Sequence, residues 1–408
     1  MEESSTQMIV YEEEKSFWSV GLWAVIVSQF LSALADNALL FAAIAALRAL
    51  SAPEWQIPML QEFFVIGFIL LAPFVGLIAD KFPKGRVLLG SNFIKLLGSL
   101  GMVFGFSPIF CYGVVGVGAA AYSPAKYGIL GQLVKEEQLV KANGIMEGST
   151  IVAILLGAMF GGFFADDSPG VALGAVLICY ILAIIGNFFI PKLPSIAPHH
   201  SLAIRPAIKE FGHSFVKLFR NSNARFSMLG TGIFWGAGST LRFLLVAWVP
   251  LALSIENNKT PALLNAVVAI GIAVGAFFAA KFITLKNVSK VIPAGICIGL
   301  TVIAFAYTTN IYLAVILLIL LGALGGFFVV PLNALLQDEG THSVGAGHAV
   351  AVQNLTENTT MLLMVGLYTL MLKVGVEIIP AAVLFGFLIS FGILAISIIR
   401  YFSKIKID

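Results

Sequence analysis

Long apolar segments dominate the pattern of hydrophobic and polar positions along the chain. Each extends over about 20 residues or more with few charges, the length that an α-helix needs to cross the roughly 30 Å hydrocarbon core of a bilayer. The pattern predicts twelve transmembrane helices, at about 18–48, 57–79, 87–106, 109–131, 145–165, 171–191, 226–253, 261–285, 288–308, 310–336, 345–373 and 375–400.

The longest interruption of this pattern divides the helices into two sets of six. It contains six basic residues against a single acidic one, Glu210, and three prolines near its start. We therefore expect an all-α membrane protein built from two pseudo-symmetric six-helix bundles. The expected parts are a cytoplasmic N-terminal tail (1–17), a first bundle (18–191), a basic cytoplasmic linker (192–225), a second bundle (226–400) and a cytoplasmic C-terminal tail (401–408).

A weak internal repeat relates the two predicted bundles. Gly118 and Pro124 in the fourth helix correspond in position to Gly325 and Pro331 in the tenth, and the segment MEGST in the fifth helix resembles TENTT in the eleventh. Internal repeats of this kind are typical of secondary transporters. We expect the two prolines to break their helices at matching depth and to help form a gate.

Basic residues are distributed unequally between the two sides of the predicted membrane. With the N-terminus inside, 18 of the 24 Lys and Arg residues fall on the cytoplasmic side and three on the other. This bias predicts that both termini are cytoplasmic. The N-terminal tail is acidic, unlike the basic start of a signal peptide, so we expect the first helix to remain uncleaved.

Composition excludes several classes of protein. Hydrophobic residues make up 59% of the chain and charged residues 11%, whereas soluble domains hold about 25% charged residues. The net charge of +3 gives no indication of nucleic-acid binding. Three cysteines lie inside apolar runs without disulfide or zinc spacing, so we expect no metal and no cofactor. The chain is predicted to be a polytopic carrier or channel.

Six ionisable side chains lie inside the apolar helices: Asp36, Lys95, Lys126, Glu147, Arg242 and Glu357. Facing lipid near the bilayer centre, each would cost about 2.5–3.5 kcal/mol, so we expect them to face one another or water. For Lys95 and Glu147, snorkelling toward the interface or bracing of helix contacts is an equally good interpretation, because each lies nearer a helix end. The other four are predicted to form a polar core in the substrate path.

Further polar residues extend this candidate site. Asn37 directly follows Asp36 and is placed with the core. A secondary cavity or gate is predicted from Tyr122, Pro124, Tyr127, Glu147, Pro331, Asn333, Gln353, Asn354 and Asn358. The four core charges sum to zero. That balance fits a ligand that carries both a phosphate and an amine, and it fits equally a network that satisfies itself.

A charged loop follows the second predicted helix, in the segment GLIADKFPKGRV. Asp80 ends the helix, and Lys81 and Arg86 lie just beyond it. We expect these residues to form a cytoplasmic latch that closes in one state and releases in another. The loop resembles the G-x-x-x-D-(K/R)-x-G-(K/R) pattern of the major facilitator superfamily, matched by Gly76 and Gly85 as well, with two extra residues before Gly85.

Longer strings over nearly the whole chain resemble the bacterial lysophospholipid transporter family of that superfamily. They are QFLSALADNALLF (29–41), GAAAYSPAKYGILG (118–131), ANGIMEGSTIVAILLG (142–157), FWGAGSTLRFLLVAWVP (234–250) and GGFFVVPLNALLQ (325–337). The resemblance implies movement of lysophospholipids, such as lysophosphatidylethanolamine, across the inner membrane to the cytoplasmic leaflet. There a partner acyltransferase with acyl-carrier-protein synthetase activity re-acylates them. It also implies that Asp36, Lys126, Arg242 and Glu357 form the polar core.

The leading interpretation is thus an alternating-access carrier without enzymatic activity. Arg242 and Lys126 would bind the lipid phosphate, with Asp36 and Glu357 as their resting partners, while the acyl chain lies in an apolar slit or in the bilayer. No histidine is followed five residues later by Asp, so the acyltransferase is expected on a separate chain. Whether sodium, a proton or no ion drives transport is left open.

Three alternatives remain at this point. The first is a proton-coupled exporter of small amphipathic compounds, with Asp36 or Glu357 carrying the proton. The second is a membrane-embedded lipid-modifying enzyme, against which the lack of a buried catalytic constellation argues. The third is a scaffold that only docks the acyltransferase, and the charges inside the helices argue against it.

Overall fold

The computed structural model describes residues 18–135, 139–195 and 204–405, apart from some side chains within these ranges, that of Glu147 among them. In this part the chain forms thirteen α-helices, one short 3₁₀ helix and no strand. The helices are α1 (Val20–Ala49), α2 (Gln56–Lys81), α3 (Lys84–Val103), α4 (Pro108–Leu133), α5 (Leu139–Asp167), α6 (Pro169–Asn187), α7 (Ile204–Arg220), α8 (Ser222–Leu253), α9 (Lys259–Phe282), η2 (Leu285–Val291), α10 (Ile292–Ala306), α11 (Ile311–Thr341), α12 (Ala346–Lys373) and α13 (Ile378–Ile405).

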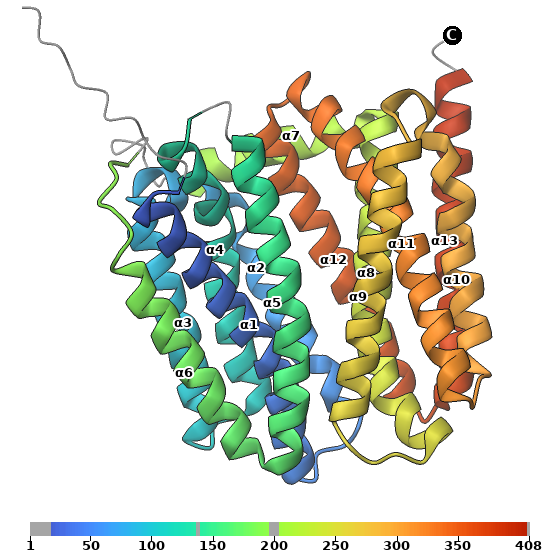
Figure 1. Ribbon diagram of the computed structural model, residues 1–408. Coiled ribbons are helices and arrows are strands. Elements are labelled where there is room, and N and C mark those ends of the chain that lie inside the picture. The colour runs from blue at the N-terminus through green and yellow to red at the C-terminus, as the bar shows by residue number, and fades with distance from the viewer. Residues whose placement is uncertain (1–17, 136–138, 196–203, 406–408) are drawn as a thin grey trace, which may run out of the picture.

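Long helices run side by side in two groups, as Figure 1 shows. In the first group α1 packs against α5 and α6, and α4 packs against α2 and α3. In the second group α9 packs against α11, α10 against α13, and α8 against α12. The groups meet where α2 contacts α12 and where α5 contacts α9. A ligand that both groups hold must therefore lie between these pairs of helices.

Twelve of the described helices have the length that a membrane crossing requires. Eleven, counting η2 and α10 as one, are also apolar enough to cross a membrane. The twelfth, α12, has 28 residues and carries a polar run, QNLTENTT, in its middle. A helix this polar can cross only where the run faces protein or water. The predicted all-α membrane architecture with twelve membrane-length helices is confirmed.

The predicted basic linker contains a helix that the sequence analysis missed. In α7 the residues Ala207, Ser214 and Leu218 are buried at helical spacing, and all the charged residues of the helix are exposed. Leu218 packs in a small apolar cluster with Met228 of α8 and Val352 of α12. Figure 1 shows α7 lying across the end of the molecule. Its amphipathic periodicity is the signal that would have predicted it.

Glycine brings two helices of the second group into backbone contact. A Cβ atom on Gly275 of α9 would lie 1.9 Å from the carbonyl oxygen of Ala323 in α11, and one on Gly271 would lie 2.3 Å from that of Ile319. From the opposite side, a Cβ on Gly322 would lie 2.1 Å from the carbonyl oxygen of Val268. No larger residue fits such a crossing without separating the helices. We call this contact the glycine seam.

Both prolines that were expected to break helices lie inside continuous ones. Pro124 lies within α4 and Pro331 within α11, and each helix continues for about two and a half to three turns beyond its proline. The predicted breaks were wrong, because a proline removes one backbone donor while the remaining hydrogen bonds carry the helix through. The hydroxyl of Ser227 in α8 donates to the carbonyl of Leu332, the residue after Pro331, and this bond ties α8 to α11.

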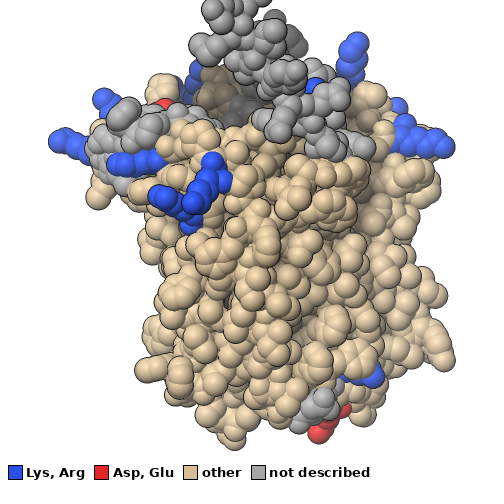
Figure 2. Space-filling view, turned by 60° about the vertical axis from the view of Figure 1, so that its left-hand side comes forward, with Lys and Arg blue, Asp and Glu red and all other residues tan. Residues whose placement is uncertain are grey.

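Basic side chains gather at one end of the molecule. Figure 2 shows most of the visible Lys and Arg at the end across which α7 lies, and few at the opposite end. This distribution agrees with the unequal numbers of Lys and Arg that the sequence places on the two sides of the predicted membrane. That the basic end faces the cytoplasm stays a prediction.

Candidate substrate-binding cavity

A cavity of about 450 Å³ lies between the two groups of helices. Its volume falls in the range of about 300–1,000 Å³ that small-molecule sites occupy. The polar residues of its lining come from both groups: Gln29, Ser32, Asp36, Asn37, Gln61, Lys95, Tyr112, Tyr122, Ser123, Lys126, Thr150, Ser239, Arg242 and Asn265. Of the predicted core, Asp36, Asn37, Lys126 and Arg242 thus share one cavity, and Tyr122 joins them.

Asp36 is held inside the first group by two close partners. The Lys95 ammonium lies 2.6 Å from its Oδ2, and the Tyr180 hydroxyl donates to its Oδ1 at 2.6 Å. The side chain of Lys95 is only 2% exposed, so it does not snorkel. Lys95 is therefore the ion-pair partner of Asp36, which sequence reasoning did not identify.

The pair belongs to a wider polar network. Lys95 also donates to Ser32 Oγ at 3.0 Å, and Ser32 in turn donates to Asn92 Oδ1 at 2.7 Å. The Lys95 ammonium lies 4.8 Å from the centre of the Tyr122 ring. Since charge-assisted hydrogen bonds and cation–π contacts are both attractive to the ammonium group, this network offsets part of the cost of burying the charges inside the helices.

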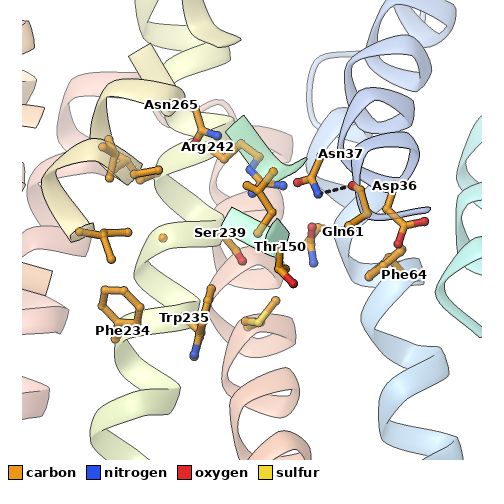
Figure 3. A pocket seen from close by; sticks show the side chains of 18 of the residues that line it. Asp36, Asn37, Gln61, Phe64, Thr150, Phe234, Trp235, Ser239, Arg242 and Asn265 are labelled. Atoms are coloured by element: carbon orange, nitrogen blue, oxygen red, sulfur yellow. Dashed lines mark hydrogen bonds between the residues drawn. The ribbon is translucent and has the colours of Figure 1, made fainter. Parts of the chain in front are cut away.

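Arg242 enters the cavity from the second group. Figure 3 shows its side chain reaching from α8 toward Asn37 on α1, with Asn265 of α9 beside it. Its Nε is buried without a hydrogen-bond partner, and no carboxylate of the described residues lies within ion-pair distance of its guanidinium. The expectation that Arg242 rests against Asp36 or Glu357 was wrong, because Lys95 and Tyr180 already bind Asp36.

Lys126 also lines the cavity, from α4. Its side chain is buried, with 8% exposure, and its ammonium lies 4.3 Å from the centre of the Tyr127 ring. Tyr127 itself does not line the cavity, and neither does Pro124. Glu147 falls in α5, but its side chain lies outside the described residues.

Glu357 lies in a separate polar cluster between α11 and α12. The Gln353 amide donates to Glu357 Oε1 and to Asn333 Oδ1, both at 2.7 Å. Asn358 donates to the backbone carbonyl of Asn354 at 2.7 Å. None of these residues lines the cavity, nor does Pro331. The structure therefore separates the predicted site into a cavity and a cluster inside the second group.

The charged loop after α2 pairs differently from the expected latch. Asp80 Oδ1 lies 3.0 Å from the ammonium of Lys84, which is buried in the first turn of α3 and also donates to the Ala79 carbonyl at 2.9 Å. Arg86 is exposed and Lys81 half-buried. In this conformation the carboxylate fixes the turn between α2 and α3, and a latch between more distant helices stays a prediction.

Polar contacts join the two groups at one end. At the end of α1, Arg48 donates to Asn258 Oδ1 at 2.8 Å and approaches the carbonyl of Val246 at 3.5 Å. The Thr369 hydroxyl of α12 donates to Glu62 of α2 nearby. The contacts of Arg48 and Thr369 hold the two groups together at the end opposite α7, which we call the closed end.

Sequence reasoning missed several uncharged residues of the cavity. Gln29 and Gln61 line it from the first group, and Ser239 and Asn265 line it from the second. Figure 3 shows Gln61 near Asp36 and Ser239 on the same helix as Arg242. The spacing of Gln29 to Asp36 is seven residues, which puts both on one helix face. This spacing is the signal that would have identified Gln29, because the uncharged residues of the predicted site were chosen for lying close in sequence to the charges.

Comparison with known proteins places the chain in a family. The model of the Major Facilitator Superfamily matches residues 25–363. The chain belongs to the Major Facilitator Superfamily. This membership confirms the predicted family and fold, and it places the protein among transporters rather than enzymes.

Relatives and solved structures agree with this assignment. The chain is 55% identical over 381 residues to proteins named lysophospholipid transporter LplT from Escherichia coli (strain SMS-3-5) and from Shigella boydii, covering 93% of this chain and 96% of each relative. Its fold is similar to that of the nucleoside transporter NupG, at 12% identity and a TM-score of 0.72, over 94% of this chain and 99% of that one. A POT family transporter in complex with 5-aminolevulinic acid gives 13% identity and a TM-score of 0.70, over 95% and 97%.

Proposed function

We propose that this protein is an alternating-access carrier that moves lysophospholipids, such as lysophosphatidylethanolamine, to the cytoplasmic leaflet of the inner membrane. The names of its relatives support this cargo. The observation that carries the proposal is Arg242, a guanidinium in the cavity whose Nε lacks a partner. A charge in that position is costly until an anion binds it.

A lipid phosphate fits this guanidinium well. Arginine presents a planar set of donors that binds two phosphate oxygens at once, and such charge-assisted bonds are the strong ones. Lys126 supplies a second cation to the same cavity, and Asn37 and Asn265 supply uncharged hydrogen-bonding groups. Because Lys95 and Tyr180 bind Asp36, the phosphate meets Arg242 without competition from that carboxylate.

Alternating access follows from the contacts at one end. We propose that the two bundles, 18–191 and 226–400, move as units, and that the Arg48 contacts separate when the opposite end closes. With the basic end and both termini in the cytoplasm, the conformation described here opens inward. A separate acyltransferase with acyl-carrier-protein synthetase activity would then receive the lipid at that face.

The test is uptake of labelled lysophosphatidylethanolamine into proteoliposomes. We expect Arg242→Ala to reduce the rate by roughly 10- to 150-fold, because a hydrogen bond to a charged group contributes about 1.5–3 kcal/mol. Arg242→Lys should recover part of the rate, and Arg205→Ala, on the exposed face of α7, is the matched control. Transport by a normally inserted Arg242→Ala protein at the rate of the unchanged protein would refute the assignment.

Imposed gradients in the same vesicles test a coupling ion. We propose that a cation, a proton or sodium, binds at Glu357, whose carboxylate accepts a hydrogen bond from a neutral amide and forms no ion pair among the described residues. Glu357→Gln should then abolish the dependence on the gradient and preserve exchange. If unlabelled lysolipid does not compete with the labelled substrate while small amphipathic cations do, the exporter is the better interpretation.

A further inference from the structure

The cavity has a second part that the polar site does not use. Beyond α8, part of its lining comes from α9, α10 and α11 of the second group. Apart from Asn265 in the second turn of α9, which lies with the polar site, the residues of this part are apolar or glycine. These residues, which we call the apolar slot, are Val268, Ala269, Ile272 and Ala273 of α9, Ile298 and Val302 of α10, and Leu321, Gly322 and Gly325 of α11. Figure 3 shows apolar side chains on the far side of α8 from Asp36 and Asn37.

The slot opens onto the same space as the phosphate site. Gly238 of α8 also lines the cavity, and a Cβ atom placed on it would meet nothing within 4 Å. Trp235, one turn earlier on the same face of α8, is 43% exposed although it lies in the cavity wall. Both observations indicate unfilled space between Arg242 and the slot, so one ligand can contact both.

Empty space with an apolar wall favours an apolar occupant. Water needs two or more polar partners to remain in a cavity, and the slot residues offer only side chains of carbon and hydrogen. The glycine seam also closes the wall between α9 and α11, where the Cβ positions of Gly271 and Gly322 fall within 2.3 Å of facing carbonyl oxygens. A chain in the slot therefore cannot leave between these two helices.

We propose that the apolar slot holds the acyl chain of the bound lipid inside the second bundle, next to the headgroup at Arg242. This inference rests on the proposed lysophospholipid transport and adds the path of the chain. A chain that stayed in the bilayer would pass between the two bundles and obstruct their closure around the headgroup. A chain that lies in the slot moves with one bundle and leaves the interface free to close.

Filling the slot tests this path. Ala273 lies in the slot, and Val274, the next residue of α9, is 43% exposed and does not line the cavity. We expect Ala273→Phe to lower the ratio of palmitoyl- to hexanoyl-lysophosphatidylethanolamine transport at least tenfold, and Val274→Phe to leave it unchanged. Each methylene group that is displaced from the slot weakens binding of the lipid roughly fourfold, so displacing two of them weakens binding more than tenfold. An unchanged ratio in Ala273→Phe would overturn the proposal.

Photolabelling gives a second measurement that does not depend on the variants. A palmitoyl lysolipid with a diazirine in its chain, irradiated in the unchanged protein, should label residues 268–273, 298–302 or 321–325. Labels found only on lipid-facing positions of α2 and α12 would contradict the slot. If the unchanged protein transports no lysophospholipid yet the slot is labelled, the carrier function fails while the chain site stands.

Discussion

The buried pair of Asp36 and Lys95 allows a quantitative test of what holds the first bundle together. We consider the replacement of Lys95 by Met, which keeps the apolar length of the side chain and removes its charge. The ammonium lies 2.6 Å from Oδ2, and the side chains of Lys95 and Asp36 are 2% and 18% exposed. The change leaves Asp36 with the hydroxyl of Tyr180 and without a cation.

The magnitude follows from distance and burial. Coulomb's law at an effective dielectric constant of about 20 gives roughly 6 kcal/mol at this separation, as an upper bound on the attraction. Removing one member of a buried pair costs about 3–5 kcal/mol, and the partial exposure of Asp36 favours the lower value. We expect Lys95→Met to destabilise the protein by about 3 kcal/mol. At about 2 °C per kcal/mol for a long chain, Tm should fall by roughly 6 °C.

The double variant separates the pair from other effects of each substitution. Asp36→Asn combined with Lys95→Met removes both charges. In a double-mutant cycle, the loss of stability of this double variant should be smaller than the sum of the two single losses by at least about 2 kcal/mol. Thermal unfolding in detergent measures all four proteins, followed by a dye that reacts with the buried Cys111 in a background in which Cys179 and Cys297 are replaced by Ala. Additive losses, or a Lys95→Met protein as stable as the unchanged one, would refute the pairing.

Two further predictions concern the packing of the second group and the closed end. A Cβ on Gly275 would lie 1.9 Å from a backbone oxygen, so Gly275→Ala should cost about 1–3 kcal/mol of stability, whereas Gly174→Ala, with no atom within 4 Å, should be neutral or slightly stabilising. The same unfolding assay compares them, and equal Tm values would contradict the seam. Arg48→Ala removes about 1 kcal/mol of contacts and should shift the population open at that end about fivefold. Spin labels in segments 50–53 and 254–256, which leave the partners of Arg48 unchanged, measure it, and an unchanged distance distribution would count against the closure.

Helix positions were predictable because membrane crossing imposes one length and one composition. The predicted segment 226–253 ends where α8 ends, at Leu253, and the polar α12 was found through its flanking apolar residues. α7 was missed because its apolar residues are spaced for one face rather than forming a run. A search for long apolar runs cannot detect a helix that lies on a surface.

The site was only partly predictable from the sequence. The free-energy cost of placing a charge inside an apolar helix identifies the charged residues but not their partners. This argument selected Asp36 and Arg242, which do line one cavity. It did not pair Asp36 with Lys95, which is 59 positions away on another helix, and it grouped Glu357 with residues that the fold keeps apart from it. Those assignments depend on which faces of two helices meet, and that information arises only from packing.

The Arg48 contacts can act as a pivot about which α1 rotates. They lie at one end of α1, whose 30 residues span about 45 Å. A tilt of about 10° about that end would displace the opposite end by roughly 8 Å, while Asp36, about 18 Å from the pivot, would move only about 3 Å. The binding site lies less than halfway along α1 from this pivot. A small rotation can therefore displace the far end of the helix more than twice as far as the groups that hold the ligand.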